Sequence, residues 1–151
     1  MKNILFVFII AGSLSISCQD NKVTEVTKTE AEWKELLTPS EFHILREKGT
    51  ETAFTGEYWN TSTKGTYCCK ACGLPLFNSD TKFKSGTGWP SFYNVSVKKN
   101  IKKVNDYSNN MLRIEIQCSN CNAHLGHLFN DGPKQTGLRY CINSCSLIFK
   151  D

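Results

Sequence analysis

The residues best suited to chemistry lie near the carboxyl end of the chain, around Cys141. Cys141 comes two residues after Arg139 and follows a segment that holds His124 and His127. A thiolate is the nucleophilic form of cysteine, and a nearby cation such as Arg139 favours it over the thiol. Histidine is the side chain best suited to donating a proton near neutral pH. These residues predict a thiol-based active site, and the alternative for each histidine is a structural role.

Four other cysteines form two C-x-x-C pairs, Cys69 with Cys72 and Cys118 with Cys121. Two sulfurs at this spacing can bind one metal ion, and two such pairs complete a tetrahedral four-thiolate zinc site. The pairs are farther apart than in a compact zinc finger, so the metal would join distant strands. Disulfides are the competing interpretation in an exported protein. We expect one structural zinc ion per chain, bound by these four cysteines.

A second set of metal ligands is compatible with the spacing. Cys118, Cys121, His124 and His127 follow one another at regular intervals and could supply a mixed site on their own. That metal would be catalytic, and the first C-x-x-C pair would need another use. The four-thiolate site ranks first because it is closed and leaves the histidines free.

The amino terminus has the pattern of an export signal. Residues 1–17 form a basic head, an apolar core and a serine-rich end, and the apolar stretch is shorter than the ~20 residues of a spanning helix. Residues 14–18 resemble a bacterial lipoprotein processing box, except that Ser15 stands where a leucine is expected. Cys18 would then carry lipid. We expect a signal peptide at 1–17, a polar tether at 18–30 and one domain at 31–151, in an exported bacterial protein that is periplasmic or membrane-anchored.

Length and charge limit the remaining function classes. The chain has 151 residues and a formal net charge of +4. That charge is small and scattered, so nucleic acid is not an expected partner. We interpret the one basic cluster as a solvated loop or hairpin edge, with a docking face for an acidic partner as the alternative. The cluster consists of Lys98, Lys99, Lys102 and Lys103.

One helix is strongly indicated after residue 38. Thr38 and Glu41 have the spacing of a capping box, and Pro39 occupies the first helical position. This predicts a helix that ends at Gly49, because glycine favours the left-handed conformation found after a helix. A preceding turn or two of helix is expected around Trp33.

After Gly49 the sequence pattern is that of strands and loops. Residues 112–118 alternate apolar and polar, as a half-buried strand does. Shorter strands are expected at 66–69, 95–97, 101–104 and 146–150. Glycine and proline indicate loops at 85–90 and 131–133. We therefore expect a mainly β domain with short N-terminal helices, whose chemistry lies on loops.

Several long motifs occur along the folded part. They are Cys69-x-x-Cys72-Gly73…Leu76-Phe77, Ser85-Gly86-Thr87-Gly88-Trp89-Pro90-Ser91-Phe92, the stretch from Cys118 to Pro133, and the stretch from Thr136 to Ser144. In this order, and from Trp33 to Phe149, they resemble the peptide methionine-(R)-sulfoxide reductases, the MsrB family. The resemblance implies a fold of two antiparallel β-sheets (a β-tent), a structural four-cysteine zinc site, and reduction of the R epimer of methionine sulfoxide.

The resemblance also implies roles for single residues. Cys141 would attack the sulfoxide sulfur while His124 and His127 help to protonate the oxygen, which leaves a sulfenic acid on Cys141. Four further residues would line the site or hold the thiolate. Trp89 would be an apolar wall for the S-methyl group, with core packing as its alternative role; Phe129 would line the pocket, and Asn143 and Arg139 would hydrogen-bond near the reacting centre.

Thr87 departs from the pattern of many family members, which carry a resolving cysteine in this loop. A threonine cannot form a disulfide, so we expect an external thiol to reduce the sulfenic acid. Cys145 is the next candidate for resolving it, although a disulfide across so short a span tends to be strained. Cys68 is the third candidate, and the alternative for both is a buried, inert thiol.

Partners follow from the resemblance and the export signal. We expect oxidised proteins or peptides that carry methionine-R-sulfoxide as substrates and a thioredoxin-like reductant outside the cytoplasm. A zinc-containing binding module without activity would not need Cys141, Arg139 and both histidines. A thiol–disulfide oxidoreductase that uses C-x-x-C is disfavoured because two such pairs fit a metal better.

Overall fold

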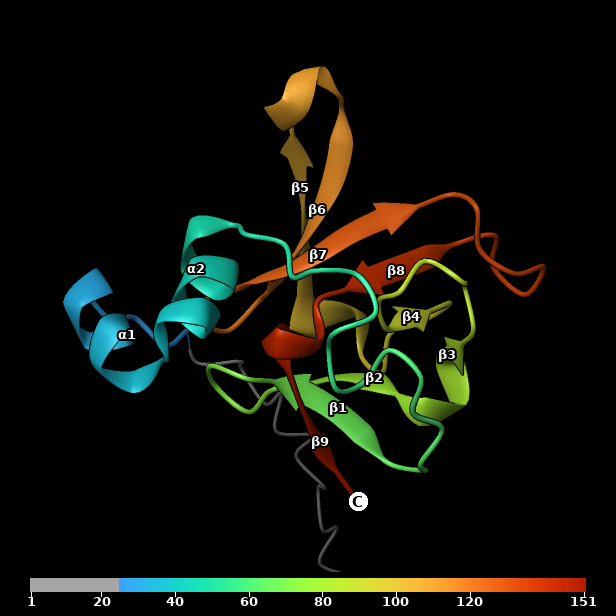
Figure 1. Cartoon of the computed structure of the whole chain (residues 1–151), viewed down its shortest axis with the longest axis horizontal. Coiled ribbons are helices and arrows are strands. Elements are labelled where there is room, and N and C mark those ends of the chain that lie inside the picture. The colour runs from blue at the N-terminus through green and yellow to red at the C-terminus, as the bar shows by residue number, and fades with distance from the viewer. Residues whose placement is uncertain (1–24) are drawn as a thin grey trace, which may run out of the picture.

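The computed structural model describes residues 25–151, which form two helices and two β-sheets (Figure 1). The helices are α1 (Glu30–Leu36) and α2 (Pro39–Glu47). The three-stranded sheet has the order β2-β1-β9 and consists of β1 (Thr66–Cys69), β2 (Pro75–Asn78) and β9 (Leu147–Lys150). The six-stranded sheet has the order β3-β4-β8-β7-β6-β5 and consists of β3 (Lys82–Phe83), β4 (Ser91–Phe92), β5 (Ile101–Asp106), β6 (Arg113–Cys118), β7 (His124–Phe129) and β8 (Arg139–Ile142).

Both sheets are antiparallel, which confirms the expected fold class. An aromatic cluster joins them. Phe77 of β2 stacks on Phe92 of β4 with ring centroids 4.4 Å apart, and Tyr67 of β1 meets the same ring edge-on at 5.1 Å. Because the rings come from different sheets, this cluster fixes one sheet against the other.

The helices form for local reasons. Thr38 accepts a hydrogen bond from Glu41 N while the Glu41 side chain accepts from Thr38 N, which confirms the predicted capping box. Thr29 and Glu32 make a second box at the start of α1, which the sequence analysis did not identify. The left-handed residue that ends α2 is Lys48, with φ 61°, one position before the glycine that was expected to end it.

The strand predictions at 66–69, 101–104, 112–118 and 146–150 are confirmed within one or two residues, and β5 is longer than predicted. The strand predicted at 95–97 is wrong. Val95 is buried, but its N–H donates to the Asn94 side chain, and Ser96 makes only an isolated backbone bond to Leu76. Val95 therefore packs beside a sheet without joining its ladder, and Val97 is exposed.

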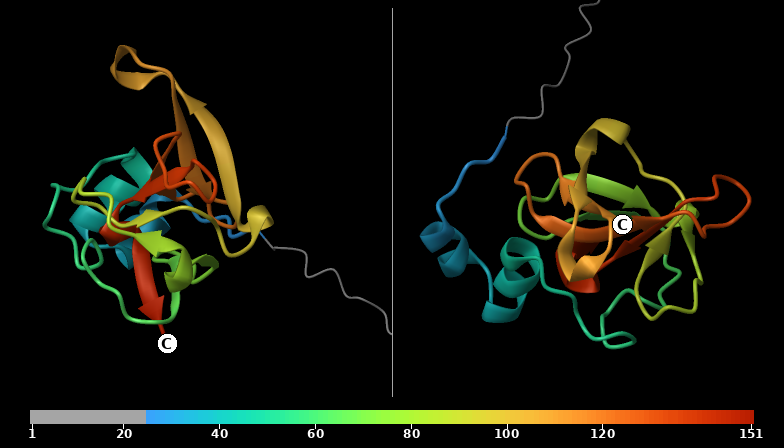
Figure 2. Two further views of the ribbon diagram at one scale, coloured as in Figure 1. Left: turned by 90° about the vertical axis from the view of Figure 1, so that its right-hand side faces the viewer. Right: turned by 90° about the horizontal axis from the view of Figure 1, so that it is seen from above.

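Strands β5 and β6 form a hairpin, the β5–β6 arm (residues 101–118), which projects beyond the rest of the molecule (Figures 1 and 2). β5 is the outer strand of its sheet and carries Lys102 and Lys103, while Lys98 and Lys99 precede it. Charged side chains on an outer strand disfavour pairing with another chain. The basic cluster is thus the hairpin edge that was expected.

The predicted signal peptide at 1–17, Cys18 and most of the predicted tether lie outside the described residues. Within the tether range, Val26 N donates to Asn120 O at 2.6 Å, and Asn122 donates to the Glu25 carboxylate at 2.8 Å. Residues 25 and 26 therefore contact the domain. Within residues 25–151, neither helix has the length and apolar character needed to cross a membrane.

Candidate active site and metal centre

Strand register brings the predicted nucleophile next to a histidine. In the β7–β8 ladder Cys141 lies directly opposite His127, and in the β4–β8 ladder it lies opposite Ser91. Directly opposed residues of an antiparallel pair project their side chains to the same face of the sheet. The thiol and the imidazole are therefore held by two rigid strands, which corrects the expectation that the chemistry lies on loops.

A β-bulge in β7 turns both histidines to the same side. His124 and His127 are an odd number of residues apart, so a regular strand would point them to opposite faces. The β6–β7 register shifts between Ile116 and Gln117, which leaves Leu125 as an extra residue in β7. The two imidazole rings consequently lie with centroids 5.4 Å apart.

Gly126 allows β7 and β8 to approach each other closely. A Cβ atom at this position would lie 2.0 Å from the carbonyl oxygen of Cys141, and the residue has a φ of 153°. No side chain fits this space without moving the backbone. The glycine of the His124-Leu125-Gly126-His127 segment is thus needed for Cys141 to lie beside His127.

Cys141 and His127 open into a cavity of about 160 Å³. Five of the predicted site residues line it, together with four that were not predicted. The predicted ones are Trp89, His127, Phe129, Cys141 and Asn143, and the others are Thr50, Arg113, Gly126 and Ile142. The cavity therefore combines a thiol, an imidazole and two aromatic side chains.

Opposing effects act on the pKa of the Cys141 thiol. Burial raises the pKa of the Cys141 thiol, while the positive charge of Arg139 and hydrogen bonds from Thr87 and Arg139 lower it. Arg139 is itself fixed by two hydrogen bonds of 2.8 and 2.9 Å to the Asp131 carboxylate, and its guanidinium lies 4.4 Å from the Phe129 ring centroid. Arg139 is thus held in place as the cation that favours the Cys141 thiolate.

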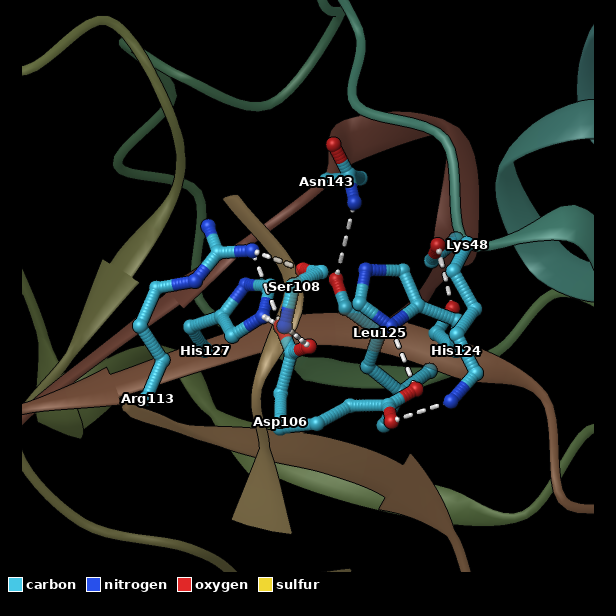
Figure 3. A network of polar contacts seen from close by, with 10 residues as sticks. Lys48, Asp106, Ser108, Arg113, His124, Leu125, His127 and Asn143 are labelled. Carbon is cyan, nitrogen blue, oxygen red and sulfur yellow. Dashed lines mark hydrogen bonds and ion pairs between the residues drawn. The ribbon is translucent and has the colours of Figure 1, made fainter. Parts of the chain in front are cut away.

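His127 is held by an ion-pair network that reaches the β5–β6 arm (Figure 3). Its Nε2 lies 2.7 Å from Asp106 Oδ2, and the same oxygen accepts from Arg113 Nη2 at 2.8 Å. Burial lowers the pKa of His127, whereas the hydrogen bond to Asp106 raises it. The Asp106 carboxylate therefore favours the protonated imidazole against the effect of burial.

His124 lies deeper than His127. Its side chain is 2% exposed, and its Nδ1 lies 2.8 Å from Glu115 Oε1, while the other carboxylate oxygen of Glu115 accepts from Lys48 Nζ at 2.9 Å (Figure 3). The hydrogen bond to His124 and the bond to Lys48 lower the pKa of Glu115 to about 2, although burial opposes them and is the largest single effect. Of the two histidines, only His127 is among the residues that line the cavity.

Glu51 joins the parts of the site that come from different segments. Its carboxylate accepts from Ser144 N at 2.6 Å and Cys145 N at 2.9 Å, and its carbonyl accepts from Trp89 Nε1 at 3.1 Å. Its own N–H donates to the Asn143 side chain at 3.1 Å. Glu51 thus fixes two cavity residues, Trp89 and Asn143, relative to the end of β8.

The four C-x-x-C sulfurs gather at one point between the two sheets. All four lie within 4.8 Å of one another, and the Cys69–Cys121 and Cys72–Cys118 sulfurs are 3.7 and 3.6 Å apart. Zinc bonds of ~2.3 Å in a tetrahedron would separate the sulfurs by about 3.8 Å, so the observed arrangement fits a four-thiolate metal site. The separations are too long for disulfides.

Both metal-site turns have the same backbone design. The residue after each pair is left-handed, with φ 74° at Gly73 and 58° at Asn122, and its N–H donates to the carbonyl of the first cysteine, Cys69 or Cys118. The alternative mixed site is excluded by the geometry, because His124 bonds to Glu115 and lies outside the sulfur cluster. One turn links β1 to β2 and the other links β6 to β7, so a metal would join the two sheets.

The two candidate resolving thiols lie away from the ladder that holds Cys141. Strand β8 ends at Ile142, and Cys145 follows in a 3-10 turn, so the regular strand needed to bring it to the face of Cys141 is missing. Burial and the charges of Glu41 and Glu51 raise the pKa of Cys145 to about 11. Cys68 is 1% exposed in β1, within the other sheet.

The charged residues that contact the histidines were not predicted from the sequence. Arg113 and Glu115 alternate with apolar residues in β6, a pattern that predicts only a half-buried strand. In fact Glu115 is 1% exposed and lies opposite His127 in the β6–β7 ladder. The one feature of the sequence that could have indicated a role for Arg113 and Glu115 is their position on the strand that leads into the second C-x-x-C pair.

A family model and curated relatives are similar to this chain over most of its length. The SelR domain family model matches residues 37–151. Proteins named peptide methionine sulfoxide reductase MsrB are 56% identical over 126 residues in Thiobacillus denitrificans and 57% identical over 126 residues in Leptospira interrogans, covering 83% of this chain and 96% of each relative. The one from Methanosarcina barkeri is 57% identical over 125 residues, covering 83% of this chain and 88% of the relative.

Among solved structures, the Yippee-like domain of Mis18 is similar to this chain with a TM-score of 0.48 and 16% identity, covering 59% of this chain and 97% of that chain. The residues matched by the family model, 37–151, include the cavity residues, both histidines with their charged partners, and all four cysteines of the C-x-x-C pairs. The chain therefore belongs to the SelR domain family, together with relatives named peptide methionine sulfoxide reductase MsrB.

Proposed function

We propose that the protein reduces methionine sulfoxide in proteins or peptides to methionine and that it acts on the R epimer. The observation that carries this proposal is the register of β7 and β8, which sets Cys141 opposite His127 in a cavity walled by Trp89 and Phe129. A thiol beside a proton donor is what transfer of a sulfoxide oxygen requires. The names of the relatives support the same reaction.

In the proposed reaction, the Cys141 thiolate attacks the sulfoxide sulfur. The sulfoxide oxygen is a poor leaving group until it is protonated, and the His127 imidazolium supplies the proton. Oxygen passes from the substrate to Cys141, so that methionine is the reduced product and a cysteine sulfenic acid is the oxidised one. In the imidazolium Nε2–H faces Asp106, which leaves the proton on Nδ1 for the substrate.

The other predicted residues assist this step. Trp89 is the wall against which an apolar S-methyl group packs, and Phe129 extends that apolar surface. Arg139 stabilises the thiolate, and Asn143 lies at the cavity with its side chain bonded to Glu51 and Leu125. We assign His124 a positioning role, because it is buried behind His127 and does not line the cavity.

We infer that the metal is zinc and that its role is structural. Four thiolates fill a tetrahedral zinc site, which leaves no open position for a substrate. Cys69, Cys72, Cys118 and Cys121 would hold the ion, and it would supply a fixed connection between the two hairpin turns.

For the second half of the cycle we propose an external thiol reductant of the thioredoxin class. Thr87 occupies the loop position next to Cys141 and cannot form a disulfide. Two moles of external thiol convert the sulfenic acid to thiol and water and become a disulfide themselves. Trapping the oxidised protein and mapping its disulfides tests this proposal, and a stoichiometric Cys141–Cys145 bond would contradict it.

The amino-terminal sequence pattern supports a further proposal about location. We infer that the protein is exported and that Cys18 carries a lipid anchor, so oxidised proteins outside the cytoplasm would be its substrates. Membrane fractions of cells producing wild type and Cys18→Ala would decide this. Equal partition of the two proteins into the membrane would refute the lipid anchor.

The reaction is tested by assaying separate R and S epimers of a peptide methionine sulfoxide with dithiothreitol as reductant. We expect turnover of the R epimer by the wild type, none by Cys141→Ser, and near-normal turnover by the control Cys145→Ser. Turnover of the S epimer alone, or full activity of Cys141→Ser, would refute the proposed function.

A further inference from the structure

We propose that a groove beside the β5–β6 arm binds an apolar side chain adjacent to the oxidised methionine in an extended polypeptide substrate. This inference rests on the proposed function and adds a specificity site to it. The groove has a volume of about 700 Å³ and is lined by Met111, Leu112, Arg113, Ile114, Leu128, Phe129 and Asn130.

The groove exists because two neighbouring strands diverge. The β6–β7 ladder ends at the pair Ile114–Leu128, whereas β6 stays paired with β5 as far as Arg113. Beyond that point the arm rises away from β7, as Figures 1 and 2 show. The space between the separating chains is therefore a fixed feature of the fold.

The groove adjoins the active-site cavity. Arg113 and Phe129 line both, and they come from the two strands that flank the junction. An extended chain advances about 3.3 Å per residue. A polypeptide with its sulfoxide at Cys141 thus places the neighbouring side chains at the rim of the cavity, where the groove begins.

The chemistry of the groove selects apolar side chains. Met111 is 55% exposed and Leu112 is 65% exposed at its edge. Of the seven large apolar residues that are exposed within residues 25–151, four lie on the arm, which are Val104, Tyr107, Met111 and Leu112. Two of the four, Met111 and Leu112, line the groove. Neighbouring exposed apolar residues indicate a binding surface, whereas isolated ones do not.

The charge in the groove lining does not favour acidic side chains over apolar ones. Arg113 is the only charged residue of the groove lining, and its guanidinium donates to the Asp106 carboxylate at 2.8 Å. A paired cation attracts an acidic side chain weakly. The groove is therefore suited to leucine, isoleucine or phenylalanine next to the sulfoxide, and less suited to charged or small polar residues.

The test compares three R-epimer substrates in the dithiothreitol assay, namely Leu-Met(O)-Leu and Ser-Met(O)-Ser peptides and N-acetyl methionine sulfoxide methylamide. We expect the wild type to have a kcat/KM roughly three- to tenfold higher for the leucine peptide than for the serine peptide. Leu112→Ser should remove most of that preference, and Leu112→Ile should retain it. Leu36→Ser, a substitution of a leucine that is 61% exposed on α1, serves as the matched control and should behave as wild type.

The single-residue substrate separates this inference from the proposed function. N-acetyl methionine sulfoxide methylamide is too short to reach the groove, so the Leu112→Ser variant should convert this substrate at the wild-type rate. Failure of the wild type to reduce it would refute the function itself. Reduction without any preference between the two peptides would refute only the groove. A change in oligomeric state of Leu112→Ser, measured by sedimentation, would instead assign the surface to a second copy of the chain and overturn the proposal.

Discussion

At the scale of single residues, burial disfavours the charged forms of Cys141 and His127, the two groups of the proposed reaction. It raises the pKa of Cys141 and lowers the pKa of His127, so each group is shifted towards its neutral form. One charged partner opposes each shift, Arg139 for the thiol and Asp106 for the imidazole. The charges lie on different strands, so each can be removed without removing the other.

Replacing Arg139 with Met should raise the pKa of Cys141 further, because a positive charge and a hydrogen bond that favour the thiolate are lost. A smaller thiolate fraction at any given pH follows, and turnover at neutral pH should fall. The rate of alkylation of Cys141 as a function of pH measures the shift directly. Arg139→Lys keeps the charge and should retain part of the effect; an unchanged midpoint in Arg139→Met would contradict the assignment.

Asp106→Asn should lower the pKa of His127, since the carboxylate that raises it is removed while burial remains. The imidazolium fraction at neutral pH would decrease, and with it kcat. Titration of the His127 ring protons by NMR measures the pKa, and the rate is measured on the same sample. Asp80→Asn, which removes an exposed partner of Lys64, is the control and should change neither value. A normal rate in Asp106→Asn would exclude His127 as the proton donor.

At the scale of elements, the bulged strand β7 and its contact with β8 are what place the site. Gly126→Ala would put a Cβ atom 2.0 Å from the Cys141 carbonyl oxygen, so the strands must separate. We expect a loss of about 2 kcal/mol or more in the free energy of unfolding, together with a fall in kcat.

Gly137→Ala is the matched control for that experiment. Gly137 has a φ of 69°, but a Cβ atom there would have no neighbour within 4 Å. Conformational strain alone should cost about 1 kcal/mol. Urea unfolding measures both variants, and equal destabilisation would show that the close approach of β7 and β8 does not constrain Gly126.

Local sequence patterns predicted some of the elements and contacts but not others. Helix α2 was predictable because Thr38, Pro39 and Glu41 act on their own backbone. Strands β7 and β8 were not predicted, and in β7 the bulge at Leu125 interrupts the alternation of residues. The four-cysteine cluster was predictable because each C-x-x-C pair is recognisable from its spacing in the sequence. The contact between Asp106 and His127 was not predictable, because it depends on a strand register that local sequence does not specify.

At the scale of the whole molecule, two features join the sheets: the aromatic cluster and the four-cysteine site. The turn that holds Cys118 and Cys121 leads directly into β7, which carries both histidines. A single short segment therefore connects the four-cysteine cluster to the candidate active site.

Removal of the metal should destabilise the protein and lower its activity indirectly. A bound structural zinc ion contributes to folding free energy, because the unfolded chain has no preformed site. We expect chelation, or the variant Cys72→Ser, to lower the melting temperature markedly, with loss of activity in proportion to unfolding. Metal analysis with thermal melts checks this; a protein purified without zinc and with an unchanged melting temperature after chelation would contradict the structural role.

The most direct test of the central claim is a single turnover without reductant. The wild type is mixed with excess R-epimer substrate, and the methionine formed and the mass of the Cys141 peptide are measured. The proposed reaction predicts about one methionine per protein chain and one added oxygen atom on Cys141, trapped by a sulfenic acid reagent. Methionine formation with Cys141 unmodified, or the oxygen found on Cys145 or Cys68 instead, would contradict it.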